Sequence, residues 1–393
     1  MDKKKILLVS LGHLSCDING GALPAILPFL RSAYDLSYQA TGGLMFAYAC
    51  LSSMIQPLFG LLSDRFSKPW FIPLGVLLAG CGLAAIGWMP GYWGIFAAIG
   101  LSGVGAALFH PEGARFANAV SGQNKGTGMS LFSIGGNGGF VLGPLLATAC
   151  LGAFGLPGTT IFAVLAVMTA GTLVWSIARM EATKKAGAAA GKASPAVGAE
   201  GETPGENNWR EFLKLTVSIV TRSITFVGFN TFIPLYWVSA FGQSTATGAI
   251  ALTFFSVCGV ISNFFGGMLA DKFGYRTVIR VVFALMPPVV AGFSLSNNLY
   301  AAWALLPLLG FVLYAPFSAQ VVLGQQYLAK NIGFASGITL GLATSLGGVV
   351  APLLGWIADH YGMAATFQSL AALSIVGAIF AYLLKPVTVK KGK

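Results

Sequence analysis

Two titratable side chains lie inside the first long apolar stretch of the sequence, residues 6–30. His13 and Asp17 are four positions apart there, so in a helix they share one face. A charged side chain at mid-bilayer costs roughly 2.5–3.5 kcal/mol on insertion scales and therefore indicates a functional site. We predict that Asp17 takes up and releases protons together with His13. The alternative for His13 is a structural hydrogen bond to a neighbouring helix.

A second group of polar side chains, His110, Glu112 and Arg115, lies in the apolar stretch 92–118. Glu112 and Arg115 are three positions apart and can pair on one helical face. The alternative is a purely structural pair near the helix end, where long charged side chains reach toward the interface. We assign Glu112 to proton coupling, and His110 and Arg115 to substrate binding.

The same side chains leave two other kinds of chemistry open. His13, Asp17, His110 and Glu112 make up a possible N/O ligand set for a metal ion. No ligand spacing demands such a site, so we expect neither a metal nor a cofactor. An intramembrane enzyme is the weakest alternative, because no nucleophile–base motif, hydrolase elbow or cofactor loop accompanies these residues. We therefore expect no catalytic residue.

A buried base is predicted in the seventh apolar stretch, residues 211–240. Arg222 lies about eleven residues from the start of that stretch, at the same depth as Asp17 in the first, and the two are 205 positions apart. We predict that they pair across a central cavity, since an ion pair lowers the cost of both charges. In this interpretation Arg222 also supplies positive charge for a phosphonate, carboxylate or phosphate group.

The composition identifies the environment that these residues occupy. Of the 393 residues, 55% are hydrophobic and 9% charged, whereas a soluble domain carries about 25% charged residues. A surface of this size with so few charges must face lipid. The net charge of +11 could indicate nucleic-acid binding, but the charges lie in short loops between apolar stretches, so we expect no nucleic-acid partner.

Twelve stretches are long and apolar enough for membrane helices, which need about 20 residues. The first six are residues 6–30, 39–62, 70–89, 92–118, 127–153 and 158–179. The second six are residues 211–240, 246–270, 277–296, 299–326, 333–358 and 363–384. The break between them is rich in Ala, Gly, Lys and Glu, which is typical of a flexible linker. We predict an N-terminal bundle at 1–179, a cytoplasmic linker at 180–209 and a C-terminal bundle at 210–393.

Lys and Arg are concentrated in alternate loops, in the linker and at the C-terminal end. The other set of loops holds essentially Arg31 alone. By the positive-inside rule this predicts a multi-pass protein of the cell inner membrane with both termini cytoplasmic.

An internal repeat relates the two halves. The loop Gly60-Leu-Leu-Ser-Asp64-Arg65 matches Gly267-Met-Leu-Ala-Asp271-Lys272 at an offset of 207, and Pro144 matches Pro352 at an offset of 208. Near-constant offsets indicate duplicated halves. The aspartate in each loop can cap a helix and pair with a base, so we predict that both loops help to close the cytoplasmic side. These candidate gating residues are Asp64, Arg65, Asp271, Lys272 and Arg276.

The repeated loop is the signature of the major facilitator superfamily, which the whole chain resembles. Within it the chain is similar to the fosmidomycin-resistance group of efflux proteins. The residues that carry this are His13-x-x-x-Asp17, Phe109-His110-Pro111-Glu112-x-x-Arg115, Gly135-Gly136-Asn137-x-Gly139-x-x-x-Gly143-Pro144 and Ala358-Asp359-His360. The resemblance implies the major facilitator fold, an all-α membrane protein whose twelve transmembrane helices form two pseudo-symmetric six-helix bundles.

The resemblance also implies that helices 1, 4, 7 and 10 line one central cavity. Candidate substrate-binding residues are then Arg222, Arg115, His110, Asn137, Asn230, Gln320 and Gln325. Gly139, Gly143 and Pro144 resemble the antiporter motif of helix 5 and are candidate gating residues; the alternative is ordinary small-residue packing. Two positions depart from the pattern. Ile99 stands where antiporters carry an arginine, and Gln326 replaces the usual glutamate.

Together these features predict a secondary transporter that exports a small, drug-like anion in exchange for protons. The alternative is a proton-coupled importer of an organic anion or metabolite. The expected partners are the solute, protons and the lipid bilayer, and we expect a monomer. The five cysteines lie in apolar stretches without disulfide spacing and are interpreted as packing residues.

Overall fold

The structure is a computed structural model of the chain. It describes residues 2–55, 69–122, 125–188, 206–331, 334–335, 338–339 and 343–387. The described ranges contain helices and connecting turns and no β-strand. The chain is thus an all-α membrane protein with the predicted fold class.

Helices of the first half follow the predicted apolar stretches closely. They are α1 (Lys3–Tyr34), α2 (Tyr38–Ala49), the π-helix η1 (Cys50–Met54), α4 (Phe71–Ala85), the 3₁₀-helix η2 (Ile86–Trp88), α5 (Tyr92–Val120), α6 (Lys125–Phe154), the 3₁₀-helix η3 (Leu156–Thr159) and α7 (Thr160–Ala188).

The second half comprises α8 (Trp209–Ser239), α9 (Thr245–Phe273), α10 (Tyr275–Ser294), α11 (Leu299–Tyr314), α12 (Pro316–Tyr327), α14 (Ala343–Tyr361) and α15 (Met363–Tyr382). The tenth predicted span is divided into α11 and α12 at Ala315, directly before Pro316, a residue that cannot donate a backbone hydrogen bond.

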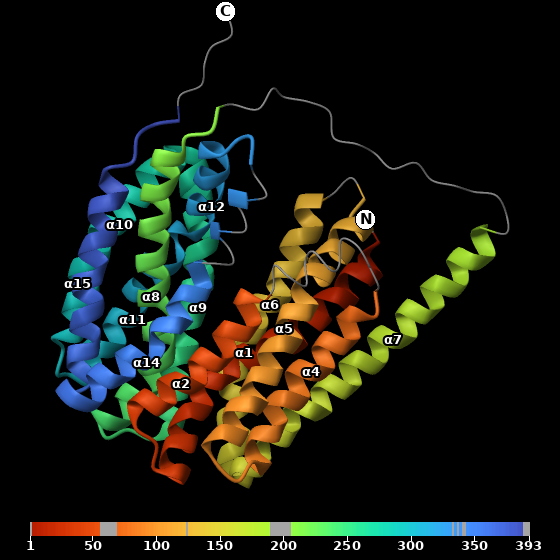
Figure 1. The fold of residues 1–393 in the computed structure, drawn as a ribbon, viewed down its shortest axis with the longest axis horizontal. Coiled ribbons are helices and arrows are strands. Elements are labelled where there is room, and N and C mark those ends of the chain that lie inside the picture. Colours follow the sequence, from red (N-terminus) through yellow and green to blue (C-terminus); the bar gives the residue numbers. More distant parts are fainter. Residues whose placement is uncertain are drawn as a thin grey trace, which may run out of the picture.

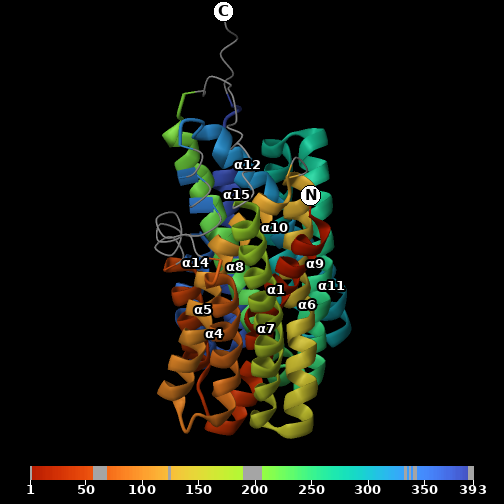
Figure 2. The same ribbon diagram turned by 90° about the vertical axis from the view of Figure 1, so that its right-hand side faces the viewer.

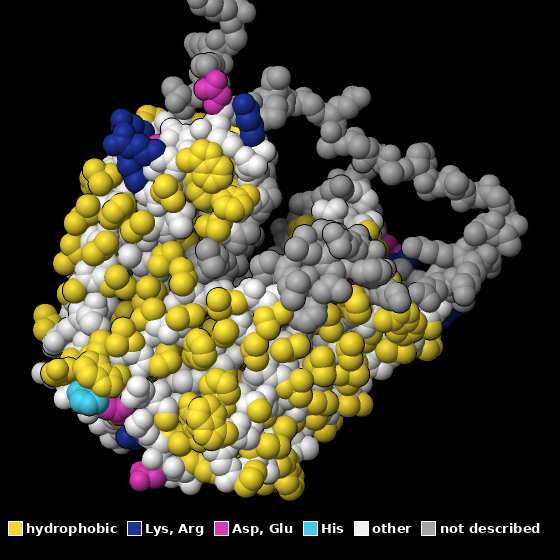
Figure 3. Space-filling view, in the orientation of Figure 1, with side chains coloured by type: hydrophobic (Ala, Val, Ile, Leu, Met, Phe, Trp, Pro, Cys, Tyr) yellow, Lys and Arg dark blue, Asp and Glu magenta, His cyan; other side chains and the backbone are white. Residues whose placement is uncertain are grey.

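Ten spans in the described ranges are long and apolar enough to cross a membrane. The two other predicted spans, 39–62 and 333–358, run through residues outside the described ranges. Figure 2 shows the helices running along one common direction. Hydrophobic side chains cover the middle of the face in Figure 3, and charged side chains gather near its edges. This distribution suits a protein that is surrounded by lipid.

The sixth predicted span, residues 158–179, agrees with the apolar segment Leu156–Arg179. The helix α7 that contains it continues to Ala188. The extension contains Met, Glu, Ala and Lys, which are good helix formers, so the helix continues past its apolar part. The division of the chain at residues 179 and 210 into two bundles and a linker stays a prediction.

The helices form two groups, one from each half of the chain (Figure 1). The core of the second group includes Phe229, Trp237 and Phe367, and the first has separate cores that contain residues such as Leu23 and Phe109. The groups meet where α2 packs against α14 and where α6 packs against α9, and they diverge toward the end where both termini lie (Figure 1).

Candidate functional site

A cluster of three titratable side chains surrounds Asp17 in the first group of helices. Oδ1 of Asp17 lies 2.9 Å from Nε2 of His110 on α5, and Oδ2 lies 3.1 Å from Nε2 of His13 on α1. Nδ1 of His13 donates to the carbonyl oxygen of Phe132 at 2.8 Å, and the two rings stack with centroids 4.0 Å apart. Residues from α1, α5 and α6 therefore hold one carboxylate between two imidazoles.

Counting hydrogens shows which protonation state this geometry requires. A carbonyl oxygen only accepts, so Nδ1 of His13 carries a hydrogen in its contact with Phe132. Without a further proton, a lone pair on Nε2 of His13 would face a carboxylate oxygen of Asp17 at 3.1 Å, which is repulsive. If the site binds no cation, one proton lies on His13 or Asp17 at this contact. A third hydrogen lies in the hydrogen bond between Asp17 and His110.

Glycines of α6 give the cluster its room. A Cβ atom on Gly136 would lie 2.6 Å from Nε2 of His13 and 2.7 Å from Oδ2 of Asp17. A Cβ atom on Gly139 would lie 2.6 Å from the backbone nitrogen of Ile18, so the backbone of α6 passes directly over that of α1. The close approach of α6, which glycines alone allow, positions the carboxylate.

Three of the four residues considered as possible metal ligands lie close together in the structure. Ligand atoms of His13, Asp17 and His110 all lie within 4.8 Å of one another. Glu112 is not part of this group; its Oε1 accepts from Nη2 of Arg115 at 2.7 Å. Imidazole lone pairs and a carboxylate can bind either a proton or a cation, so the expected absence of a metal stays a prediction.

The Glu112–Arg115 pair forms as its spacing predicts. The Glu112 side chain is 3% exposed and that of Arg115 is 43% exposed, so a partly exposed arginine neutralises the charge of a buried acid. Since this pair is separate from the Asp17 cluster, a coupling role for Glu112 and a substrate role for Arg115 stay predictions. His110 contacts Asp17, and its assigned role in substrate binding stays a prediction.

Arg222 is buried in the second group of helices, with 5% of the residue exposed. Its Nε donates to Oε1 of Gln320 at 2.8 Å and its Nη1 to the carbonyl oxygen of Leu313 at 2.8 Å. The guanidinium also lies 5.5 Å from the ring centre of Phe317. These partners are all neutral. Among the described residues, no carboxylate lies within ion-pair distance of Arg222.

A second donor lies beside this arginine. Nε2 of Gln320 is buried and has no hydrogen-bond partner in the described part of the chain, and an orphaned buried donor costs about 1–3 kcal/mol. Arg222 and Gln320 together therefore offer positive charge and an amide donor without an acidic acceptor. This is the arrangement expected of a site for an anion.

The predicted ion pair between Asp17 and Arg222 is wrong for this conformation. Asp17 is shared by His13 and His110, and Arg222 is held by Gln320 and Leu313, so each charge finds its partners within its own group of helices. The repeat offset predicted equal depth in the membrane. It carried no information on the side chains from adjacent helices that lie closer than the opposite half.

The other predicted substrate ligands occupy varied surroundings. Asn230 on α8 is 8% exposed, and Asn137 and Gln325 are half-buried on α6 and α12. Gln326, which takes the place of the usual glutamate, is exposed. Contact with a solute is a prediction for each of these residues.

Predicted gating residues lie partly outside the described ranges, which exclude Asp64 and Arg65. Asp271 accepts a hydrogen bond from the hydroxyl of Tyr275 at 2.8 Å, and Lys272 lies 5.3 Å from the ring centre of Phe273. Gly143 packs on α1 like Gly139, and Pro144 follows it within α6. A gating role for all of these residues stays a prediction.

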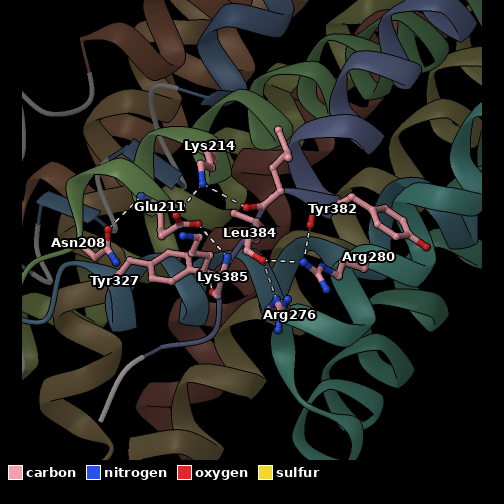
Figure 4. Close-up of polar contacts among 10 residues, drawn as sticks. Asn208, Glu211, Lys214, Arg276, Arg280, Tyr327, Tyr382, Leu384 and Lys385 are labelled. Atoms are coloured by element: carbon pink, nitrogen blue, oxygen red, sulfur yellow. Dashed lines mark hydrogen bonds and ion pairs between the residues drawn. The ribbon is translucent and has the colours of Figure 1, made fainter. Parts of the chain in front are cut away.

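Arg276 belongs to a polar network that ties three helix ends together (Figure 4). Arg276 and Arg280 both donate to the carbonyl oxygen of Leu384, which follows α15, at 2.8 and 2.7 Å. Glu211 of α8 accepts from the backbone nitrogen of Lys385 at 2.8 Å. The network therefore joins α8, α10 and α15 within one group of helices.

Several groups in these sites were not predicted from the sequence. The carbonyl oxygens of Phe132 and Leu313 are backbone atoms, for which no residue-type signal exists. Gly136 was part of a quoted motif, and a glycine pair within an apolar stretch is the signal that could have marked it as a position of close helix approach.

Comparison with known proteins places these sites in a family context. The sequence model described as Major Facilitator Superfamily matches residues 9–352. The chain is 28% identical to the fosmidomycin resistance protein of Escherichia coli (strain K12), covering 95% of this chain and 91% of that protein. It is 29% identical to an uncharacterized MFS-type transporter of Bacillus subtilis (strain 168), covering 96% and 92%. A shorter match, 29% identical over 160 residues, is to the class C tetracycline resistance protein of Escherichia coli and covers 40% of each chain.

Solved structures with similar folds support the same architecture. A bacterial homologue of the human lysosomal transporter Spinster, in an inward-facing and occupied conformation, has a TM-score of 0.78 at 14% identity, with 96% of each chain covered. A D-xylose–proton symporter has a TM-score of 0.73 at 16% identity, with 97% of each chain covered. At these identities the similarity shows the fold.

Proposed function

This chain belongs to the major facilitator superfamily, and on that basis we propose that it exports a small, anionic, drug-like compound in exchange for protons. Its family and fold are those of membrane transporters. The proposal adds an inner-membrane location, both termini in the cytoplasm, a monomeric state and alternating access. In this orientation the structure is closed toward the outside, where α2 packs against α14.

The observation that carries the anionic substrate is the buried charge of Arg222. A buried ion without a counter-ion is costly, and a bound anion removes that cost. The guanidinium offers a planar fork that matches a carboxylate or phosphonate, and Nε2 of Gln320 supplies an additional donor beside it. The name of the relative in Escherichia coli makes fosmidomycin the first compound to test on this chain.

The cluster around Asp17 supports the proton half of the proposal. A proton shared between Asp17 and His13 leaves the pair neutral overall, and its loss leaves a single negative charge. In an exchange cycle the transporter changes conformation in one direction with the compound bound and in the opposite direction with this proton bound. His110, with 26% of its side chain exposed, is the member of the cluster that is best placed to pass the proton to water.

Charge balance favours a second candidate, proton-coupled import of an organic anion. With the proton on the Asp17 cluster and an anion on Arg222, the two sites carry no net charge. Neutral states cross the low-dielectric centre of a membrane at the lowest cost, so this balance favours movement of both ligands in one direction. The similarity to two resistance proteins favours export.

The direction of proton movement decides between the two candidates. Purified protein is reconstituted into vesicles that contain a pH-sensitive dye, and fosmidomycin or another small phosphonate is added outside without a pH gradient. Exchange predicts that the lumen becomes alkaline as the compound enters. Acidification supports import and overturns export. If neither the compound nor the proton moves although the parent protein inserts normally into the vesicles, the anion proposal is wrong.

A further inference from the structure

Asp359 makes a contact between the two bundles that the proposed function does not use. It lies near the C-terminal end of α14, within the sequence Ala358-Asp359-His360. Its Oδ1 accepts from the backbone N–H of Tyr38 and its Oδ2 from that of Gln39, both at 2.8 Å. Tyr38 and Gln39 are the first two residues of α2. One carboxylate of the second bundle thus binds the beginning of a helix of the first.

The contact completes the hydrogen bonding of this helix end. The first N–H groups of a helix have no partner within it. The side chain of Ser37 accepts from Ala40 at 3.0 Å, and its carbonyl oxygen accepts from Thr41 at 3.0 Å. The N–H groups of Tyr38 and Gln39 are bound by Asp359. A carboxylate here is also favoured by the partial positive charge at a helix N-terminus.

The same two helices pack closely along the rest of α2. A Cβ atom on Gly42 would overlap the carbonyl oxygen of Ala351, and one on Gly355 would overlap the carbonyl oxygen of Tyr38. The guanidinium of Arg31, at the end of α1, lies 4.1 Å from the ring centre of Tyr38. Asp359 therefore sits at the tip of a glycine-lined contact that closes one end of the space between the bundles.

In the described part of the chain this contact occurs once, although the fold is built from two similar halves. The offset of 208 that relates Pro144 to Pro352 relates Leu151 to Asp359. The corresponding end of α6 therefore carries a leucine in place of a carboxylate. The repeat does not explain Asp359, which favours a role that is specific to the contact between α14 and α2.

We propose that Asp359 is a gating residue of the transport cycle. Its two hydrogen bonds stabilise the state that is closed at the α2–α14 end, and they break when that end opens. The proposal rests on the alternating-access cycle of the proposed function, but not on the substrate or the coupling ion. At the end away from the termini, Asp359 thus caps a helix in the way that we predicted for the aspartates of the repeated loops at the other end.

Distances between spin labels test the gate directly. The five natural cysteines are replaced, and labels are attached at Ala33→Cys on α1 and Tyr300→Cys on α11; both positions are exposed and lie on opposite bundles next to the closed end. Asp359→Asn keeps the shape of the side chain but removes its charge and turns an NH₂ group toward one of the two N–H donors. We expect the ratio of long to short distances to rise about tenfold.

A matched control is available one residue away. His360→Gln alters a ring whose Nδ1 contacts the carbonyl oxygen of Trp356 on its own helix, so we expect parent-like distances. Gly355→Ala is a second test variant, because it pushes α14 away from Tyr38 without a change in charge, and it should shift the distances as Asp359→Asn does. Unchanged distances in Asp359→Asn, or an equal shift in His360→Gln, would overturn the gate. The measurement uses neither substrate nor gradient, so its failure is distinguishable from failure of the transport assay.

Discussion

At the scale of single residues, the two buried charged sites are stabilised in opposite ways. Asp17 has two titratable partners, His13 and His110, so its charge can be neutralised by a proton that remains in the cluster. Arg222 has only neutral partners among the described residues. A guanidinium does not release its proton in a protein, so its charge can be balanced only by another ion. This difference assigns the proton to one site and the anion to the other.

We expect Asp17→Asn to abolish transport against a gradient while exchange of solute across the membrane continues. Asparagine keeps the size of the side chain and still accepts from His110, but it cannot take up a proton in this pH range. Uphill transport and counterflow are measured in parallel in vesicles. Asp35→Asn, an exposed substitution in the turn that ends α1, is the matched control. Uphill transport by Asp17→Asn at the parent rate would remove Asp17 from the coupling mechanism.

We expect Arg222→Ala to weaken binding of an anionic solute by about tenfold to a hundredfold, because one charge-assisted hydrogen bond contributes about 1.5–3 kcal/mol. Arg222→Lys keeps the charge but not the planar fork and should lie between the variant and the parent. Binding is measured by calorimetry on purified protein. Equal affinity in all three proteins would show that the anion binds elsewhere.

At the scale of elements, α6 depends on glycine for its contact with α1. Cβ atoms on Gly136, Gly139 and Gly143 would all lie within 2.7 Å of atoms of α1, whereas nothing lies within 4 Å of a Cβ atom on Gly152. The glycines that contact α1 are spaced so that they fall on one face of the helix. This face brings the backbone of α6 close enough for the carbonyl oxygen of Phe132 to accept from His13.

We expect Gly139→Leu to destabilise the protein, while Gly152→Leu on the same helix leaves its stability close to that of the parent. Overpacking a tight contact costs about 1–3 kcal/mol, and here the clash is with backbone atoms of α1, which cannot move aside alone. The thermal midpoint of each purified variant in detergent measures the effect. Equal midpoints for the two variants would mean that α6 can move away from α1 without loss of stability.

At the scale of the whole molecule, the two bundles are joined by residues 189–208, which follow α7 and precede α8. In Figure 1 the end of α7 and the start of α8 lie on opposite sides of the molecule. The connection must therefore span this separation while the bundles move relative to each other. The residues between 189 and 205 are outside the described ranges, and their composition is typical of a linker.

We expect transport to survive replacement of residues 189–204 by a Gly-Ser sequence of equal length. It should fall when the same segment is shortened to four residues, because a short chain restricts the separation of the bundles. Transport is compared at equal amounts of inserted protein. Loss of transport in the equal-length variant would show that the natural sequence of this segment has a specific function.

The sequence alone determined where the chain crosses the membrane. A bilayer requires about 20 apolar residues per helix and satisfies no backbone hydrogen bonds, so hydropathy located the helices, including α1 and α8, to within a few residues. The Glu112–Arg115 pair was equally accessible, because a spacing of three within one helix fixes a neighbour. These features depend on positions close together in the chain.

Only the tertiary structure decided which partner each buried charge has. His110 lies 93 positions from Asp17, and Gln320 lies 98 positions from Arg222. Their proximity depends on which helices are neighbours and how each is rotated about its axis, and hydropathy records neither. The predicted pair of Asp17 and Arg222 failed for this reason. The contact of Asp359 with the start of α2 could not be predicted either, because its acceptors bind backbone N–H groups that every residue except proline provides.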